Sequence, residues 1–415
     1  MGCPNSMAWS MVDRMQTPLR IVLVHRYFHP DTPPYATILL SVARALTGAG
    51  NEVTVLTCQP SYNRHVVDRA PAHESIDGVH VVRWRVLDDR RSARRKLLNL
   101  ATFGWHLVRA PDQFRGADVV MAATTPPVLI AWLCSRLARW HGARFIYHKQ
   151  DIYPEVVEAT GEQLFGLLNR ALRRIDRRTD RRADQVVVLS DDMKEASRRR
   201  GVASDRIAVL NNFDPWDIAP VAERSGTKPS PDALTLVFAG NLGRFQGLEA
   251  LAELIRATAD ESRIAWHFFG EGPMRQTLGA LADQGCQVIM HGYQPASVVA
   301  SFVAQADLGI VSLHAGVITA AYPSKTMTYL RQGCPILAIV DEASELAGMV
   351  RANKIGLAVD QRQAATLAPW LRQLVVDRQP LSGARERARA VYEENFSSEV
   401  QLKRWVALFE GVAAS

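Results

Sequence analysis

Apolar and polar positions alternate along the chain in a repeating pattern of short buried strands and longer amphipathic helices. A β-branched run at 20–25 predicts a first strand, a helical period over 37–50 ends in a glycine, and a second strand follows at 52–57. The same pattern continues with predicted strands at 79–82, 119–122, 145–148 and 185–189. Because these runs are apolar throughout and helical segments separate them, they predict a parallel sheet covered by helices on both faces.

The pattern pauses between 214 and 233, where Pro, Ser and charged residues replace the apolar ones. This stretch is the predicted linker between an N-terminal domain at 20–213, preceded by a loose tail at 1–19, and a C-terminal domain at 234–392. Strands are predicted in the second domain at 234–239, 267–269, 288–290, 308–311 and 336–340. We therefore expect an α/β fold of two doubly wound, Rossmann-like domains, with ligands bound between them at the carboxyl ends of the strands.

The composition narrows the class of protein. The chain has 415 residues, of which 47% are hydrophobic and 22% charged, as in an ordinary globular protein; this excludes a disordered chain, a collagen and a coiled coil. Its 5 cysteines contain no CxxC pair, so we expect neither a zinc site nor a disulfide framework, and a reducing, cytoplasmic compartment. No apolar run approaches the roughly 18 residues needed to cross a bilayer, and the N-terminus does not resemble a secretory signal.

A net charge of +7 indicates anionic partners, and two basic clusters show where they could bind. One cluster is a stripe on a predicted helix, formed by Arg170, Arg173, Arg174, Arg177, Arg178, Arg181 and Arg182. The other, at 90–96, leads into an apolar segment ending at Trp105, which is the composition of a helix lying on an anionic membrane surface. A solvated helix face followed by a core-packed one explains the same residues. Nucleic acid is the weaker partner because no recognition motif is present.

The most informative motif follows the strand at 234–239. Gly240, Asn241, Gly243 and Arg244 form a glycine-rich turn that leads into a predicted helix at 248–257. Glycines allow the backbone to approach a ligand closely, the N–H groups at a helix start attract anions, and the arginine adds a full positive charge suited to a diphosphate. The turn is neither a dinucleotide fingerprint nor a Walker loop. An ordinary turn with a surface arginine is the alternative.

A second motif places a lysine at the start of a helix. Pro323 and Ser324 are helix-start residues, so Lys325 would lie in the first turn. A lysine is unfavourable there because the positive end of the helix dipole repels it, and a bound anion would relieve that repulsion. The alternative is an exposed lysine that extends into solvent.

Two other junctions between a strand and a helix carry candidate residues. The turn formed by Gly270, Glu271 and Gly272 could bring backbone close to a ligand, although the same residues also make ordinary tight turns. His148 and Asp151 follow a strand of the first domain and could orient a substrate hydroxyl between the domains. A histidine hydrogen-bonded in the core and an aspartate that caps a helix explain this second pair equally well.

Taken in order, these motifs resemble the retaining GT-B glycosyltransferases of family 4. Within that family the chain is most similar to bacterial transferases of O-antigen and capsule assembly of the N-acetyl-fucosaminyl type, over about 21–409. The matching segments are 27–31, 50–57, 60–62, 125–127, 148–155, 189–190, 211–213, 240–247, 270–273 and 323–325.

The resemblance implies roles for individual residues. Arg244 and Lys325 would hold the donor diphosphate as catalytic groups, and His148 and Asp151 would border the sugar and the acceptor. The remaining donor-binding positions would be Gly240, Asn241, Gly243, Gly270, Glu271, Gly272, Gly292, Tyr293, Ser324 and Thr328. No metal or other cofactor would be needed, because basic side chains stabilise the charge that develops. The last segment, 393–415, would be a helix that returns to the N-terminal domain.

Two positions depart from the family pattern. Gln246 stands where the family usually has a lysine, and Thr328 stands where it usually has a glutamate that binds the ribose. The expected function is transfer of a hexosyl or N-acetylhexosaminyl group from a nucleotide-diphosphate sugar to a polyprenyl-linked saccharide at the inner face of the membrane, in surface polysaccharide synthesis. A catalytically silent partner of an active transferase, which these two departures favour, and a sugar-nucleotide epimerase remain as alternatives.

Overall fold

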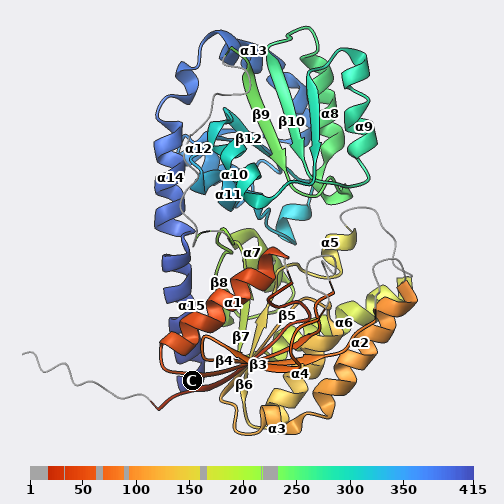
Figure 1. Cartoon of the computed structure of the whole chain (residues 1–415), viewed down its shortest axis with the longest axis vertical. Coiled ribbons are helices and arrows are strands. Elements are labelled where there is room, and N and C mark those ends of the chain that lie inside the picture. Colours follow the sequence, from red (N-terminus) through yellow and green to blue (C-terminus); the bar gives the residue numbers. More distant parts are fainter. Residues whose placement is uncertain are drawn as a thin grey trace, which may run out of the picture.

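The N-terminal domain is built on a mainly parallel sheet. The computed structural model describes residues 17–31, 33–61, 69–87, 93–158, 166–215, 217 and 232–415 (Figure 1). Within these residues, 8 strands form a sheet in the order β3-β4-β2-β1-β5-β6-β7-β8, parallel except where β3 meets β4. Their bounds are β1 (Arg20–Val24), β2 (Glu52–Cys58), β3 (His73–Ile76), β4 (Val79–Trp84), β5 (Val119–Ala123), β6 (Arg144–His148), β7 (Gln185–Val188) and β8 (Ile207–Val209).

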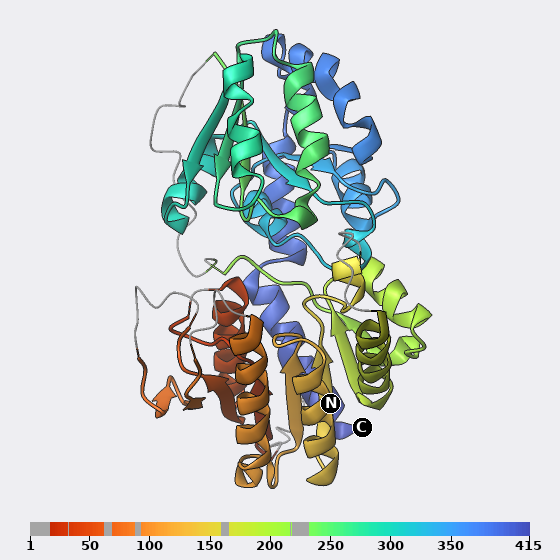
Figure 2. The ribbon, with the colours of Figure 1, turned by 90° about the vertical axis from the view of Figure 1, so that its right-hand side faces the viewer.

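Helices cover both faces of this sheet because its strands are apolar on both sides. Val22 and Val24 of β1 pack against one helical layer, whereas Ile21 and Leu23 pack against the other. The helices of the domain are α1 (Pro34–Gly48), α2 (Ala93–Val108), α3 (Pro111–Phe114), α4 (Leu129–Trp140), α5 (Glu155–Glu158), α6 (Gly166–Arg182) and α7 (Asp191–Arg199). Figure 2 faces the layer in which α2, α4 and α6 lie side by side.

The C-terminal domain repeats the plan with a smaller sheet. In the described part of the chain, 6 parallel strands follow the order β11-β10-β9-β12-β13-β14. They are β9 (Leu234–Ala239), β10 (Ile264–Phe269), β11 (Val288–Gly292), β12 (Leu308–Ser312), β13 (Ile336–Ile339) and β14 (Gly356–Val359). The helices are α8 (Leu248–Ala257), α9 (Arg275–Gly279), α10 (Ala296–Gln305), α11 (Lys325–Arg331), α12 (Glu345–Ala352), α13 (Ala368–Val376), α14 (Ala384–Asn395) and α15 (Ser398–Ala414).

The last helix crosses from the second domain to the first. Trp405, Phe409 and Val412 of α15 are buried in the same apolar cluster as α1 and β1, so the helix returns to the N-terminal domain as the resemblance implies (Figure 1). The predicted tail at 1–19 and linker at 214–233 lie mostly outside the described residues. The predicted doubly wound architecture is confirmed, and the short strands β3, β8 and β14 were not predicted.

The carboxyl ends of the two sheets face each other. Asp151, just beyond β6, forms a backbone bridge with Ala321 of the C-terminal domain, and the N–H of Ile152 donates to the carbonyl of Ala320 at 2.7 Å. A second contact joins the N-terminal ends of α7 and α12. There the N–H of Asp191 donates to the Glu345 carboxylate at 2.5 Å, and the N–H of Glu345 donates to Asp192 at 2.9 Å. The loops that carry the candidate residues of both domains therefore lie along one interface.

The chain crosses between the domains twice, and one carboxylate connects both crossings. Asp217 lies on the outgoing crossing, and its carboxylate accepts a hydrogen bond from the backbone N–H of Ser398 at 2.6 Å, at the start of the returning helix. The same carboxylate pairs with Arg331 Nε of the C-terminal domain at 3.1 Å. Asp217 thus joins the outgoing chain, the returning helix and the second domain at one point.

Candidate active site

Three glycine turns lie together at the carboxyl ends of β9, β10 and β11. The N–H of Gly240 donates to Phe269 at 2.9 Å, and that of Gly270 donates to Gly292 at 2.7 Å. A Cβ atom on Gly270, where φ is +127°, would lie 2.0 Å from the carbonyl oxygen of Gly240. Only glycine fits there, because both the backbone conformation and the close approach exclude a side chain. The structure thus brings three of the predicted donor-binding turns into direct contact.

The next residues of the first two turns are also joined. The N–H of Leu242 donates to the carbonyl of Glu271 at 2.9 Å. A Cβ on Gly272 would lie 2.5 Å from the Leu242 carbonyl oxygen and 2.9 Å from Asn241 Oδ1, whose amide also packs on Gly243. The Glu271 carboxylate is exposed and pairs with Arg275 at 2.6 Å, so it does not contact the lysine of the second motif.

Lys325 extends toward the first glycine turn. A Cβ on Gly240 would lie 3.5 Å from its Cε, its Nζ is 3.5 Å from the centre of the Phe238 ring, and it donates a hydrogen bond to Gln246 Oε1. Among the described residues it has no ion-pair partner. Burial lowers the pKa of Lys325 well below its ordinary value. The result is an amino group without a counter-ion beside the first glycine turn, and a diphosphate bound there would favour its charged form.

The other predicted positions of the C-terminal domain surround this group. Ser324 precedes α11 and is exposed, Thr328 lies one helical turn after Lys325 and is half-buried, and Tyr293 is exposed directly after the third glycine turn. Arg244 begins a 3₁₀ turn that ends at Gln246, but its side chain lies outside the described residues.

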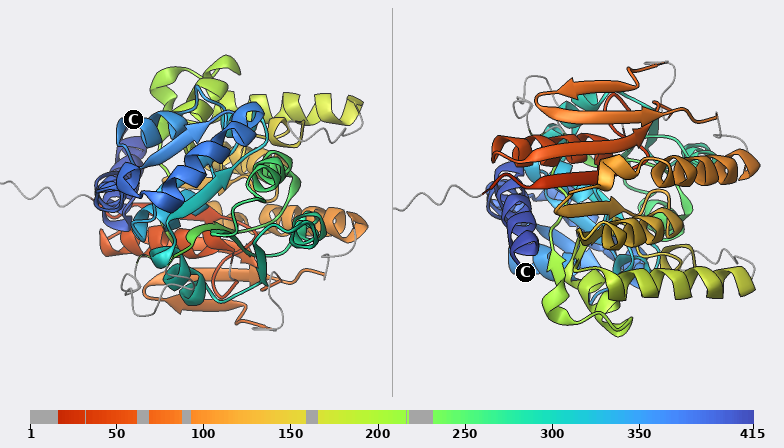
Figure 3. Two further views of the ribbon diagram at one scale, coloured as in Figure 1. Left: turned by 90° about the horizontal axis from the view of Figure 1, so that it is seen from above. Right: turned by 90° about the horizontal axis from the view of Figure 1, so that it is seen from below.

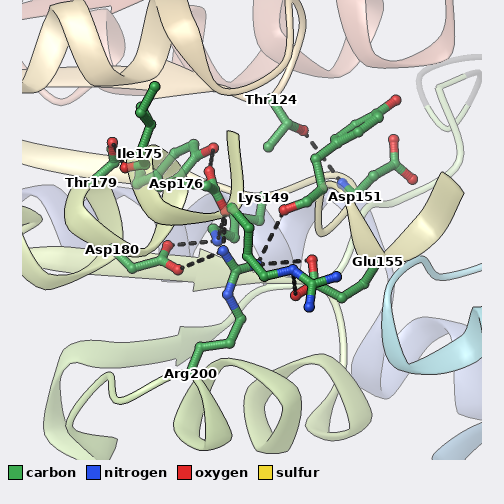
Figure 4. Close-up of polar contacts among 12 residues, drawn as sticks. Thr124, Lys149, Asp151, Glu155, Ile175, Asp176, Thr179, Asp180 and Arg200 are labelled. Atoms are coloured by element: carbon green, nitrogen blue, oxygen red, sulfur yellow. Dashed lines mark hydrogen bonds and ion pairs between the residues drawn. The ribbon is translucent and has the colours of Figure 1, made fainter. Parts of the chain in front are cut away.

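Asp151 borders the same interface from the N-terminal domain. Its N–H donates to Thr124 Oγ1 at 3.3 Å, and its carboxyl group is half-buried beside the bridge to Ala321 (Figure 4). Burial raises the pKa of this carboxyl to about 6. A carboxyl group with such a pKa can accept or donate a proton near neutral pH.

His148 lies inside the N-terminal domain and is only 1% exposed. Its Nδ1 is 2.7 Å from the Tyr35 hydroxyl, its Nε2 accepts from Gln150 at 2.9 Å, and its ring packs edge-on against Trp405 of α15. Burial lowers the pKa of the imidazole to about 3, so the ring is neutral. This is the hydrogen-bonded core position that the sequence also allowed.

A buried charge cluster next to this histidine was missed by sequence reasoning (Figure 4). Lys149, which is 0% exposed, pairs with Asp176 at 3.0 Å and with Asp180 at 2.5 Å. Arg200 of the segment after α7 pairs with both carboxylates, and the Tyr147 hydroxyl donates to Asp176 at 2.6 Å. The sequence signal that could have revealed this cluster is the pair of aspartates four residues apart within the arginine stripe. They are on the buried face of α6, whereas most of the stripe arginines are exposed.

Comparisons with known proteins identify both halves of the chain. Residues 35–212 match the Glycosyl transferase 4-like domain, and residues 222–391 match Glycosyl transferases group 1. Two curated relatives are similar along most of the chain. The probable glycosyltransferase WbjE of Pseudomonas aeruginosa is 25% identical and covers 72% of this chain and 76% of its own length. The putative colanic acid biosynthesis glycosyl transferase WcaI of Escherichia coli K12 is 23% identical over 84% of this chain and 91% of its own.

Solved structures share the whole architecture. Sucrose-phosphate synthase from Thermosynechococcus elongatus superimposes with a TM-score of 0.73 at 16% identity and covers 96% of this chain and 100% of its own. HepE from Anabaena, solved in complex with UDP, gives a TM-score of 0.67 at 14% identity and covers 95% of this chain and 100% of its own. Fold and domains together define a two-domain transferase of the GT-B type. The protein is a glycosyltransferase whose first domain matches the Glycosyl transferase 4-like family and whose second matches Glycosyl transferases group 1.

Proposed function

We propose that the protein transfers a hexosyl or N-acetylhexosaminyl group, with retention, from a nucleotide-diphosphate sugar to a polyprenyl-linked saccharide during bacterial surface polysaccharide synthesis. The observation that carries the proposal is the amino group of Lys325 beside the Gly240 turn, without an ion-pair partner among the described residues. The name of WcaI places that relative in colanic acid biosynthesis, and HepE binds UDP in its crystal structure. Both support a nucleotide-sugar donor and a polysaccharide product.

In the proposed reaction the protein stabilises the leaving nucleotide. Negative charge develops on the diphosphate as the bond to the sugar breaks, and Lys325 would neutralise it together with Arg244, so no metal ion would be required. A preorganised cation in a site with little water is worth several kcal/mol in the transition state. The glycines of the Gly240 and Gly270 turns would let the backbone lie close to the same phosphates.

A binding screen followed by one substitution tests this proposal. We expect one of the UDP-, GDP-, dTDP- and ADP-sugars to raise the melting temperature by ligand linkage, and we expect that donor to be turned over. Lys325→Ala should lower turnover about 10²–10³-fold, as loss of one charge-stabilising group does in other enzymes. Lys403→Ala, which removes an exposed lysine of α15, is the matched control. Equal turnover in the two variants would refute the site.

The proposal of a membrane-bound acceptor is supported by the ends of two helices, α2 and α6, which project from the same side of the N-terminal domain (Figure 3). Leucine pairs are exposed at both tips: Leu97 and Leu98 on α2, and Leu167 and Leu168 on α6, with Leu97 65% and Leu167 81% exposed. Arg94, Arg95 and Lys96 precede the first pair and Arg170 follows the second, and all four are exposed.

Exposed leucines flanked by cations fit an anionic lipid surface, to which each basic residue contributes about 1 kcal/mol. The opposite face of α2 packs Phe103 and Leu107 into the core, so the helix is held firmly in place. No helix in the described ranges is both long and apolar enough to cross a bilayer. We therefore propose that the protein docks on the cytoplasmic face of the membrane through these tips.

Vesicle sedimentation tests the docking. The double variant Leu97→Ser with Leu98→Ser should lose most of its binding to vesicles of phosphatidylcholine and phosphatidylglycerol, while donor hydrolysis in solution stays unchanged. Val376→Ser removes an exposed apolar side chain from the C-terminal domain and should bind vesicles normally. If the double variant sediments like the control, the helix tips do not dock on lipid.

A further inference from the structure

The ammonium group of Lys325 is held by uncharged groups alone within the described structure. It lies over the ring of Phe238 at 3.5 Å from the centre and donates to the side-chain carbonyl of Gln246. An aromatic face and an amide oxygen attract a cation but leave its charge in place. A carboxylate at the same distance would cancel that charge.

The turn that carries Gln246 is fixed on both sides. The N–H of Gln246 donates to Gly243 at 3.2 Å, and the carbonyl of the preceding Phe245 accepts from His314 at 2.9 Å. Gly247 has φ of +56°, and a Cβ there would lie 2.8 Å from the Leu313 carbonyl oxygen. The backbone at position 246 is therefore anchored against the loop after β12, and its side chain can fix the direction of the lysine.

We propose that Gln246 is a positioning residue that holds the Lys325 amino group at the Gly240 turn, where no described counter-ion competes with a diphosphate group. This inference rests on the proposed function, in which Lys325 binds the donor diphosphate. It also accounts for the departure from the family pattern: the residue that replaces the usual lysine is the hydrogen-bond acceptor of the remaining one. Both N–H donors of the Gln246 amide are unused by the described residues, so they remain available to the ligand.

Two variants of Gln246 separate the effect of the hydrogen bond from that of the charge. Gln246→Met keeps the length of the side chain and removes the acceptor, whereas Gln246→Glu keeps the acceptor and adds a negative charge. Inorganic pyrophosphate, titrated by calorimetry, is the probe. The pKa of the Lys325 amine is measured in parallel, by the pH dependence of its labelling with an amine reagent and mass spectrometry. Gln363→Met, an exposed substitution in the same domain, is the matched control.

We expect both variants to bind pyrophosphate at least about 5-fold more weakly, while the pKa of Lys325 moves in opposite directions. It should fall in Gln246→Met, because the charged form loses a hydrogen bond, and rise in Gln246→Glu, because a carboxylate favours the charged form. A merely structural role of Gln246 would not produce this opposite pair of shifts.

The outcome for Lys325→Ala distinguishes failure of this inference from failure of the proposed function. If Lys325→Ala weakens pyrophosphate binding but Gln246→Met leaves both binding and the lysine pKa unchanged, Gln246 does not position the lysine. If Lys325→Ala binds pyrophosphate like the unaltered protein, the diphosphate site itself is wrong and the inference falls with it.

Discussion

Lys149→Met tests the buried charge cluster, which holds α6 and the end of α7 against β6. The substitution removes a side chain that is 0% exposed and leaves Asp176 and Asp180, which are 1% and 0% exposed, with Arg200 as their remaining cation in the cluster. Removing one partner of a buried ion pair costs about 3–5 kcal/mol, because an uncompensated charge stays behind. Since Arg200 continues to contact both carboxylates, we expect a loss at the lower end, about 3 kcal/mol.

Urea unfolding followed by tryptophan fluorescence measures this loss for the N-terminal domain. A thermal scan should show the melting temperature lowered by about 6–12 °C, since 1 kcal/mol corresponds to about 2–4 °C in a domain of this size. Arg174→Met removes an exposed charge from the same helix and should change stability by no more than about 0.5 kcal/mol. Adding Asp180→Asn to Lys149→Met removes one of the two stranded carboxylates and should recover part of the loss.

The reasoning is refuted if Lys149→Met costs less than about 1 kcal/mol, or if Asp180→Asn makes the first variant still less stable. Either result would mean that water or a rearranged side chain replaces the lysine without cost. Because the cluster lies directly behind the segment that carries Asp151, Lys149→Met should also weaken the contact between the domains, which limited proteolysis can detect.

Three further predictions concern the turns, the domain contact and the core histidine. Gly270→Ala should cost at least about 2 kcal/mol in urea unfolding and abolish donor binding, because its Cβ would lie 2.0 Å from a carbonyl oxygen. The control is Gly348→Ala, in open space within α12, which should be neutral or slightly stabilising. Burial raises the pKa of Glu345 from 4.5 to about 7, so its contribution to stability is full below pH 4.5, falls as the pH rises from there, and is lost once the pH passes about 7. Glu345→Gln should remove that fall in unfolding measured from about pH 4 to about pH 8. Tyr35→Phe should cost about 1–3 kcal/mol by leaving His148 Nδ1 buried without its partner at 2.7 Å, and a loss below 0.5 kcal/mol contradicts the network.

The architecture could be predicted from sequence because parallel strands buried on both faces leave an unambiguous pattern. The strand at Leu234–Ala239 and the helix at Leu248–Ala257 have the bounds that the sequence predicts. The strand β3 was missed because it is short, partly buried and without a continuous apolar run. The strand β14 is apolar, but its 4 residues begin with a glycine and are too few to indicate a strand. Edge strands of this kind are defined by the neighbour they pair with rather than by their own residues.

The candidate site likewise has parts that the sequence predicts and parts that it does not. Glycine turns after strands are visible in sequence because a backbone with positive φ needs a specific residue. By contrast, nothing local distinguishes His148, whose ring nitrogens bind Tyr35 and Gln150, from a histidine that faces a substrate. Its surroundings come from α1 and from α15, more than two hundred residues away. The pairing of Lys149 with Asp176 and Asp180 was hidden for the same reason, because charged residues in sequence suggest solvent and only the fold shows that they meet inside.

The double crossing fastened by Asp217 limits how this transferase can open. The Asp217 carboxylate contacts both the start of the returning helix, at Ser398, and Arg331 of the second domain, so we expect the domains to rotate about this point rather than to slide past each other. We therefore expect the proposed nucleotide-sugar donor to enter, and the nucleotide to leave, from the side opposite Asp217. Asp217→Asn would weaken this contact between the domains and leave every residue of the candidate site unchanged.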